Sequence, residues 1–114
     1  MIPHIPPRKL AEWLTQCPAE DGLPVVLDVR EPWELQTASV HPAGFELLSM
    51  PMHTVPVRLN ELSRQRPIAC LCHHGARSAQ VAHFLANQGF DNVVNIQGGI
   101  HAWSQEVDPT VPQY

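Results

Sequence analysis

The sequence has few cysteines, few basic residues and no long apolar run. Three cysteines in 114 residues are too few, and odd in number, for a disulfide framework, so we expect reduced thiols in a cytoplasmic protein. Seven Lys and Arg against eleven Asp and Glu give a net charge of −4, which argues against nucleic acid as a partner. No apolar run approaches the ~20 residues that span a membrane. We therefore expect no membrane segment, and because the first seven residues have neither a basic nor a hydrophobic region, we expect no secretory signal.

The sequence does contain an alternation of short apolar runs with helical patterns. Apolar runs predict strands at residues 25–29, 45–50, 68–71 and 92–96, of which those at 25–29 and 68–71 are expected to be buried on both faces. Apolar residues at helical spacing predict helices that begin at Pro7, Glu31, Thr54, Arg77 and Gly98. The alternation predicts a single α/β domain over residues 1–114 with a mainly parallel sheet. The remaining segments are expected to be an extended start at 1–7 with room for an edge strand at 2–5, a turn at 19–24 and a tail at 107–114.

One stretch, residues 67–78, combines a strand pattern and a helix pattern around a cysteine. The apolar run stops at Cys72, a polar loop containing Gly75 follows, and helical spacing begins at Arg77. Cys72 is therefore expected at the carboxyl end of a buried strand, where ligands bind in open α/β sheets. Because the free N–H groups and the dipole of the following helix favour an anion, we predict that Cys72 is a nucleophilic thiolate. The alternative, a buried structural cysteine, fits Cys70 better.

Three short motifs, in order along the chain, carry a family resemblance. They are Asp-Val-Arg-Glu at 28–31, Cys-His-His-Gly-Ala-Arg-Ser at 72–78 and Gly-Gly-Ile-His-Ala-Trp at 98–103. Together they resemble the motifs of the rhodanese (thiosulfate sulfurtransferase) family. The resemblance implies a rhodanese-like fold, in which a five-stranded, mainly parallel sheet has helices on both faces and the active cysteine strand near its centre. It also implies that Asp28 and Arg30 lie close to the loop and support it; a structural ion pair and a substrate role are both open for them.

The loop from Cys72 to Arg77 has the spacing Cys-x4-Arg, one residue shorter than the Cys-x5-Arg loop of cysteine phosphatases. Backbone N–H groups that point into such a loop bind an anion, and the shorter ring suits the single sulfur of a persulfide better than phosphate or arsenate. We predict that the persulfide and its donor are bound by the loop residues His73, His74, Gly75, Ala76 and Arg77. Arg77 is expected to hold the donor's oxyanion by paired hydrogen bonds, the alternative being a surface helix residue. His73 and His74 either add positive charge when protonated or are solvated loop residues.

The resemblance and the loop together predict a sulfurtransferase that works through a persulfide on Cys72. The expected donor is thiosulfate or a related persulfide, a small sulfur-containing anion. The expected acceptor is cyanide or a thiol, including that of a thioredoxin-like or other sulfur-accepting protein. Two other classes stay open. One is a non-catalytic or sulfur-relay interaction module, against which the presence of Cys72 and Arg77 counts; the other is a cysteine phosphatase or arsenate reductase, which the loop length disfavours.

No cofactor and no metal site are predicted. The seven histidines form no His-Glu-x-x-His motif, and the cysteines form no Cys-x-x-Cys pair. Cys70 and Cys72 are also expected to point to opposite faces of their strand, so that they would not share an ion.

Overall fold

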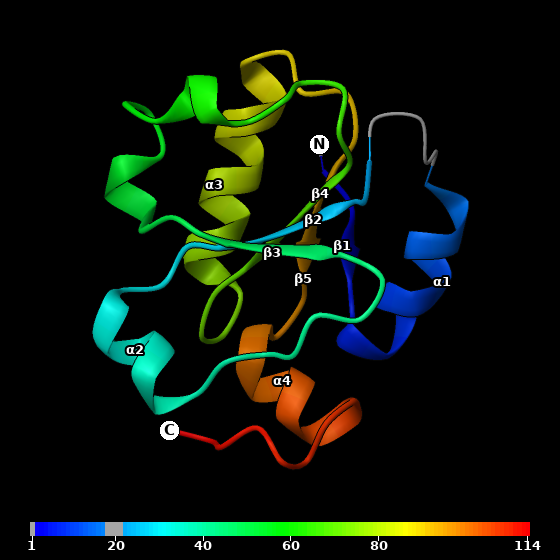
Figure 1. Cartoon of the computed structure of the whole chain (residues 1–114), viewed down its shortest axis with the longest axis vertical. Coiled ribbons are helices and arrows are strands. Elements are labelled where there is room, and N and C mark those ends of the chain that lie inside the picture. The colour runs from blue at the N-terminus through cyan, green and yellow to red at the C-terminus, as the bar shows by residue number, and fades with distance from the viewer. Residues whose placement is uncertain (1, 18–21) are drawn as a thin grey trace.

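The computed structural model of the chain describes residues 2–17 and 22–114. Five strands form one sheet in the order β1-β5-β4-β2-β3, and every pair is parallel (Figure 1). Their bounds are His4–Ile5 for β1, Val25–Asp28 for β2, Glu46–Ser49 for β3, Ile68–Leu71 for β4 and Val93–Ile96 for β5. The predicted parallel sheet is confirmed, with the edge strand in the N-terminal segment and the cysteine strand β4 at the centre. The turn predicted at 19–24 lies partly outside the described residues.

Helices cover both faces of this sheet, as predicted. Their bounds are Leu10–Gln16 for α1, Pro32–Thr37 for α2, Ala76–Asn87 for α3 and Gly99–Glu106 for α4. Helix α3 lies against one face, whereas α1 and α4 lie against the other (Figure 1). Gly89 ends α3 with a φ of +90°, and the N–H of Phe90 returns to the carbonyl oxygen of Leu85 at 3.1 Å, which is a left-handed helix cap.

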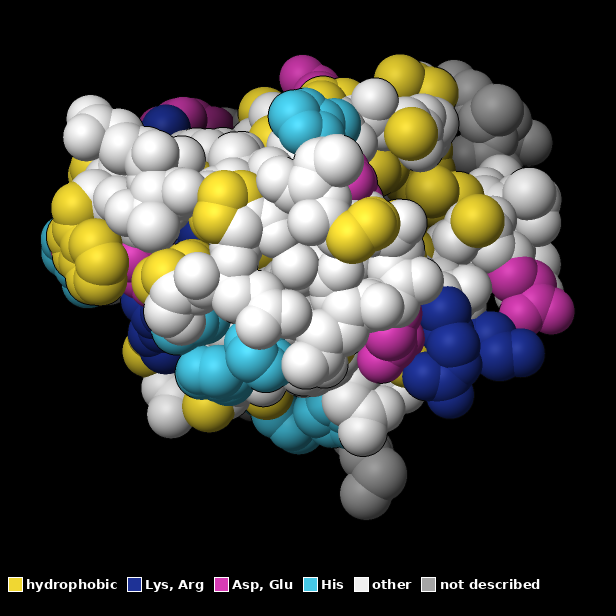
Figure 2. Space-filling view, turned by 90° about the horizontal axis from the view of Figure 1, so that it is seen from below, with side chains coloured by type: hydrophobic (Ala, Val, Ile, Leu, Met, Phe, Trp, Pro, Cys, Tyr) yellow, Lys and Arg dark blue, Asp and Glu magenta, His cyan; other side chains and the backbone are white. Residues whose placement is uncertain are grey.

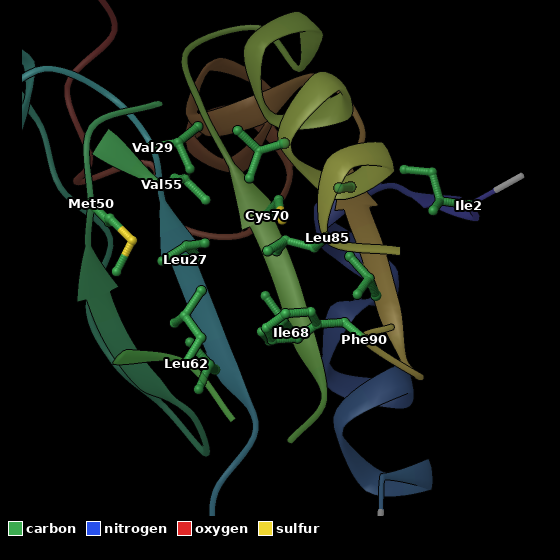
Figure 3. Close-up of a cluster of buried hydrophobic side chains, with 14 of the residues drawn as sticks. Ile2, Leu27, Val29, Met50, Val55, Leu62, Ile68, Cys70, Leu85 and Phe90 are labelled. Atoms are coloured by element: carbon green, nitrogen blue, oxygen red, sulfur yellow. The ribbon is translucent and has the colours of Figure 1, made fainter. Parts of the chain in front are cut away.

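Each face of the sheet carries its own hydrophobic core, because successive strand residues point to opposite sides. On the α3 side, Leu27, Ile68 and Cys70 pack with Leu85 (Figure 3). On the other side, the strands contribute Val26, Ala69 and Leu71, which pack with residues of α1 and α4 that include Leu10 and Trp103. The strands of the sheet centre are thus buried on both faces, which explains why they read as unbroken apolar runs.

The prediction of a helix that begins at Thr54 is wrong. Residues 52–62 instead form two short 3₁₀ helices, Met52–Thr54 and Leu59–Glu61. The hydroxyl of Thr54 donates back to the carbonyl oxygen of Pro51 at 2.7 Å, so Thr54 does not cap a following helix. One α-helical hydrogen bond does form, from the Arg58 N–H to the carbonyl oxygen of Thr54 at 3.0 Å. The next ones, from Glu61 to Arg58 and from Leu62 to Leu59, are of the tighter 3₁₀ type, so an α-helix does not continue.

The segment 107–114 has no helix or strand, but it is not a free tail. Val111 is 1% exposed, and its carbonyl oxygen accepts a hydrogen bond from Ser104 Oγ at 2.6 Å. The segment then runs to the neighbourhood of α2, beside which Figure 1 marks the C-terminus. Within the described part of the chain, no helix is both long and apolar enough to cross a membrane.

Candidate active site

Cys72 follows the last residue of β4 and is 1% exposed. The backbone N–H of Gly75 donates a hydrogen bond to the Cys72 sulfur, with N and Sγ 3.0 Å apart. Gly75 is the N-cap of the twelve-residue helix α3 and has a φ of +106°, a conformation that favours glycine. The loop therefore folds a helix N-terminus back onto the sulfur, which is the placement predicted from the strand–loop–helix pattern.

Ser78 is the contact of this sulfur that the sequence analysis missed. Its hydroxyl oxygen lies 3.3 Å from Cys72 Sγ, and the residue is fully buried in the first turn of α3. Of the N–H groups predicted between His73 and Arg77, the one hydrogen-bonded to the sulfur within the described structure is that of Gly75. The overlooked signal was a hydroxyl residue in the first turn of a helix that follows a reactive cysteine.

The Gly-Gly pair at 98–99 packs against the beginning of this loop. The N–H groups of Ile100 and His101, in the first turn of α4, donate to the carbonyl oxygens of Cys72 at 2.8 Å and His73 at 3.1 Å. A Cβ atom on Gly99 would collide with these two carbonyl oxygens. The glycine motif therefore allows α4 to approach the loop and to fix its first two residues, in agreement with its interpretation as a tight helix entry.

Arg77 forms a two-point ion pair with Glu34 of α2. Its Nη1 and Nη2 lie 2.7 Å and 2.8 Å from the two carboxylate oxygens, and the Glu34 side chain is 3% exposed. Hydrogen bonding from Arg77 lowers the pKa of Glu34 to about 2, and the same contact raises the pKa of Arg77. Arg77 is therefore neither a free surface residue nor turned toward a donor in this structure, and its donor-binding role stays a prediction.

Asp28 and Arg30 form a second ion pair behind the first. Arg30 Nη2 and Nε lie 2.7 Å and 2.8 Å from the carboxylate oxygens of Asp28, and both side chains are fully buried. Arg30 also donates to the carbonyl oxygen of Ala38 at 2.9 Å. Because neither side chain reaches the surface, the pair ties the end of β2 to the chain after α2 and cannot touch a substrate here.

Tyr114 joins both ion pairs to the loop, and nothing in the sequence indicated it. Its hydroxyl donates to Glu34 Oε1 at 2.8 Å and accepts from Arg30 Nη1 at 3.0 Å. Its ring stacks on the ring of His73, with centroids 3.8 Å apart and planes 5° apart. The segment expected to be a tail thus supplies a side chain that covers the first residue of the loop.

Three histidines gather at the mouth of the site. The rings of His73 and His74 are stacked, with their centroids 3.9 Å apart. The ring centroid of His101 in α4 lies 5.1 Å from that of His74. Figure 2, which views the molecule from the side where α2 and α4 lie in Figure 1, shows histidine side chains clustered on this face. Burial, and the neighbouring His74, lower the pKa of His73. His73 is therefore a packed side chain and not a simply solvated one, whereas His74 is exposed.

The other two cysteines differ from Cys72 in their surroundings. Burial raises the pKa of the Cys70 thiol and that of the Cys17 thiol. A raised pKa disfavours the reactive thiolate form at both residues. Cys70 and Cys72 lie in the same core cluster. The expectation that they point to opposite faces is wrong, because residues two apart along a strand share a face. Even so, residues 2–17 and 22–114 contain no group of three or more His, Cys, Asp or Glu side chains arranged to hold a metal ion.

Comparison with known protein families connects this geometry to a family. Residues 9–106 match the model of the rhodanese-like domain. The chain belongs to the rhodanese-like family. The family resemblance that the three motifs indicated is thus confirmed, and the match covers most of the chain.

Individual relatives agree with this assignment. A sulfurtransferase of Allochromatium vinosum is 35% identical over 101 residues, which cover 89% of this chain and 91% of the relative. The crystal structure of a rhodanese-related protein from Thermoplasma volcanium superposes with a TM-score of 0.75 at 32% identity, covering 98% of this chain and 99% of that one. The adenylyltransferase and sulfurtransferase MOCS3-2 of Zea mays is 37% identical over 84% of this chain, but the chain spans only 21% of that relative.

These relatives and the rhodanese-like fold support sulfur transfer as the general chemistry of the domain. Cys72, the glycine pair and the Arg77–Glu34 ion pair meet at one loop, at the carboxyl end of the central strand.

Proposed function

We propose that the protein is a sulfurtransferase that carries sulfane sulfur as a persulfide on Cys72. The observation that carries this proposal is the hydrogen bond of 3.0 Å from the Gly75 N–H to the Cys72 sulfur, at the N-terminus of the twelve-residue helix α3. A backbone N–H and a helix dipole directed at one sulfur atom favour negative charge on it. Cys70 and Cys17 have no comparable surroundings.

The reaction has two halves that balance in atoms and charge. In the first, the Cys72 thiolate attacks the outer sulfur of thiosulfate; a sulfur–sulfur bond forms to Cys72, the bond to the sulfonate sulfur breaks, and sulfite leaves with its electron pair. In the second, an acceptor thiolate or cyanide attacks the terminal sulfur of the persulfide, and the Cys72 thiolate is released. The product is the persulfide of the acceptor thiol, or thiocyanate. This sequence needs no metal and no cofactor.

The surroundings of the sulfur favour a small anionic donor. Cys72 is 1% exposed, so only a slender sulfur-bearing group reaches it without movement of the loop. The stacked rings of His73 and His74 lie at the mouth of the site. Arg77, whose side chain is 35% exposed, has guanidinium N–H groups that its pair with Glu34 does not use. We propose that these groups contact the oxygens of thiosulfate or the charged end of a related persulfide.

The proposed physiological acceptor is a thiol, either a small molecule or a thioredoxin-like or other sulfur-accepting protein. Such an acceptor and a free Cys72 thiol both suit the reducing conditions of a cytoplasm. Cyanide serves as the acceptor for assay, because it attacks the same terminal sulfur.

The decisive experiment compares three cysteine variants in thiosulfate:cyanide sulfur transfer. Cys72→Ser is expected to abolish transfer and to keep the fold, whereas Cys70→Ser and Cys17→Ser keep transfer when folded. Mass spectrometry of wild-type protein after incubation with thiosulfate should find one additional sulfur atom on Cys72, removable by a reductant. Substantial transfer by folded Cys72→Ser protein would rule out the proposal.

The same assays separate the two alternatives. A non-catalytic interaction module would neither take up sulfur from thiosulfate nor produce thiocyanate. A cysteine phosphatase would hydrolyse a small aryl phosphate above the level of a Cys72→Ser control. We expect no such hydrolysis, because the six residues from Cys72 to Arg77 make a ring that encloses one sulfur atom more closely than a tetrahedral phosphate. Inserting one residue between Gly75 and Ala76 should reduce sulfur transfer for the same reason.

A further inference from the structure

A continuous line of hydrogen-bonded side chains runs from the Cys72 sulfur to strand β1 at the edge of the sheet. Ser78 Oγ lies 3.3 Å from Cys72 Sγ and 2.5 Å from Asn95 Oδ1. Asn95 Nδ2 in turn lies 3.2 Å from the carbonyl oxygen of Gly75 and 3.0 Å from Nδ1 of His4. Since Ser78 and Asn95 are buried, their polar atoms depend on these partners.

The register of the parallel sheet places His4 at the end of this line. Strand β1 pairs with β5 so that His4 is opposite Asn95. The backbone N–H of Asn95 donates to the carbonyl oxygen of Pro3 at 2.9 Å, which fixes that register. The contact between the two side chains is therefore built into the sheet.

The carbonyl oxygen of Gly75 determines which way the Asn95 amide points. That oxygen can only accept hydrogen bonds, so the amide nitrogen must face it and the amide oxygen must face Ser78. The second amide proton is directed at Nδ1 of His4, which is therefore the unprotonated ring nitrogen. The amide oxygen and the Gly75 carbonyl oxygen both only accept, and they lie 2.5 Å and 3.2 Å from Ser78 Oγ, so the single hydroxyl proton of Ser78 is donated to the nearer acceptor, Asn95.

We propose that Asn95 is a positioning residue that holds the hydroxyl proton of Ser78 away from the Cys72 sulfur, with His4 bracing the amide. The sulfur then faces a lone pair of Ser78 Oγ, which accepts the S–H proton of a thiol and repels a thiolate. The Gly75 N–H is the remaining donor to the sulfur, at 3.0 Å. Asn95 thus favours the protonated cysteine at rest and works against the Gly75 N–H, which favours the thiolate.

The catalytic meaning of this inference rests on the proposed sulfur transfer, since attack on the donor requires the thiolate. Its test does not, because the thiolate fraction of Cys72 can be measured without any sulfur donor. The readout is the ultraviolet absorbance of the thiolate that disappears on alkylation with iodoacetamide at neutral pH. A Cys17→Ser background removes one competing thiol, and Cys70 stays protonated because burial raises the pKa of its thiol.

The effect of Ser78→Ala on the thiolate fraction of Cys72 shows which way the Ser78 hydroxyl points. Under our assignment, Ser78→Ala leaves the thiolate fraction unchanged or raises it, whereas it would lower the fraction if Ser78 donated to the sulfur. Asn95→Leu leaves the hydroxyl a choice between the sulfur at 3.3 Å and the Gly75 carbonyl oxygen at 3.2 Å. A charged thiolate is the stronger acceptor, so we expect about a tenfold rise in the ratio of thiolate to thiol, the size of effect that one hydrogen bond to a charged acceptor produces. His4→Ala should give a smaller rise.

A double substitution distinguishes positioning from a general loosening of the loop. In a Ser78→Ala background, Asn95→Leu should have no effect on the thiolate ratio, because no hydroxyl is left to redirect; in a Ser78→Thr background, which restores a hydroxyl, the rise should return. A fall in thiolate fraction on Ser78→Ala, or an equal effect of Asn95→Leu in both backgrounds, would overturn the inference. If the Asn95→Leu protein does not fold, the direction in which Ser78→Ala and His4→Ala change the thiolate fraction of Cys72 is enough to decide between the two orientations of the hydroxyl.

Discussion

Arg77 of the cysteine loop and Glu34 of α2 are joined by two parallel hydrogen bonds of 2.7 Å and 2.8 Å. The carboxylate is nearly buried and the guanidinium is about one-third exposed. Such fork-to-fork geometry fixes both partners in orientation as well as in distance. The pair therefore connects the reactive loop to a helix that follows a different strand, and its removal should affect both stability and chemistry.

Arg77→Ala should be strongly destabilising, because it leaves the Glu34 carboxylate buried without its partner. Loss of one member of a fully buried pair costs about 3–5 kcal/mol. Because the Arg77 side chain is 35% exposed and Tyr114 still donates to Glu34, urea unfolding should measure a loss below that range. The matched control is Arg58→Ala, which breaks an exposed pair with Glu61 of similar geometry and should cost much less, because water screens exposed ion pairs. Equal losses for the two variants would contradict the importance assigned to the Arg77 pair.

The double variant Arg77→Ala/Glu34→Gln tests the donor-binding role of Arg77 separately from its structural one. A neutral amide tolerates the missing guanidinium better than a carboxylate does, so part of the stability should return. If Arg77 also contacts the donor, the double variant should still show a reduced kcat/KM for thiosulfate, whereas uptake of sulfur from a neutral donor should be less affected. An unchanged kcat/KM for thiosulfate in the folded double variant would confine Arg77 to its structural role.

Acid should weaken the fold through Glu34. The pKa of Glu34 is lowered from 4.5 to about 2, first by hydrogen bonding from Arg77. A carboxyl group with a lowered pKa stabilises the folded state above its unfolded pKa, and this contribution disappears as the pH falls from 4.5 toward 2. The shift corresponds to at most about 3 kcal/mol. Unfolding free energies measured across this pH range should fall less steeply for Glu34→Gln than for the wild type; identical slopes would contradict the prediction.

The sequence was sufficient to predict the sheet, the central cysteine strand and the loop, because these depend on local patterns. Unbroken apolar runs indicated strands buried on both faces, and the glycines at 75 and 98–99 marked the tight turns. The contacts of Asn95 and Tyr114 were not predictable in this way. Each joins segments far apart in the chain, which only the folded sheet and the packed segment 107–114 bring together. Ser78, in contrast, lies six residues after Cys72, and its place in the first turn of α3 was the signal that could have indicated its contact with the sulfur.

Gly99→Ala should disrupt the site even though the change is a single methyl group. Gly99 has a φ of +60°, and an added Cβ would collide with the carbonyl oxygens of Cys72 and His73. Gly44→Ala is the control, because Gly44 also has a positive φ, of +80°, but its nearest neighbour to an added Cβ is Leu14 Cδ1 at 3.9 Å. Both variants carry the backbone strain of about 1–3 kcal/mol. Only Gly99→Ala should lose sulfur transfer or fail to fold, and comparable transfer in the two variants would argue against close packing of α4 on the loop.

Tyr114 should control the protonation of His73. Burial is the main cause that lowers the pKa of His73 from its ordinary 6.5, and the stacked ring of Tyr114, with centroids 3.8 Å apart, covers one face of the imidazole. Because burial disfavours the charged imidazolium, Tyr114→Ala should raise the pKa of His73 toward 6.5. Tyr114→Phe keeps the ring and loses the hydroxyl bonds to Glu34 and Arg30, so it should leave the pKa of His73 low and mainly reduce stability. NMR titration of the His73 ring protons measures the difference. A His73 pKa that responds equally to Tyr114→Phe and Tyr114→Ala, or to neither, would show that cover by the Tyr114 ring does not lower the pKa of His73.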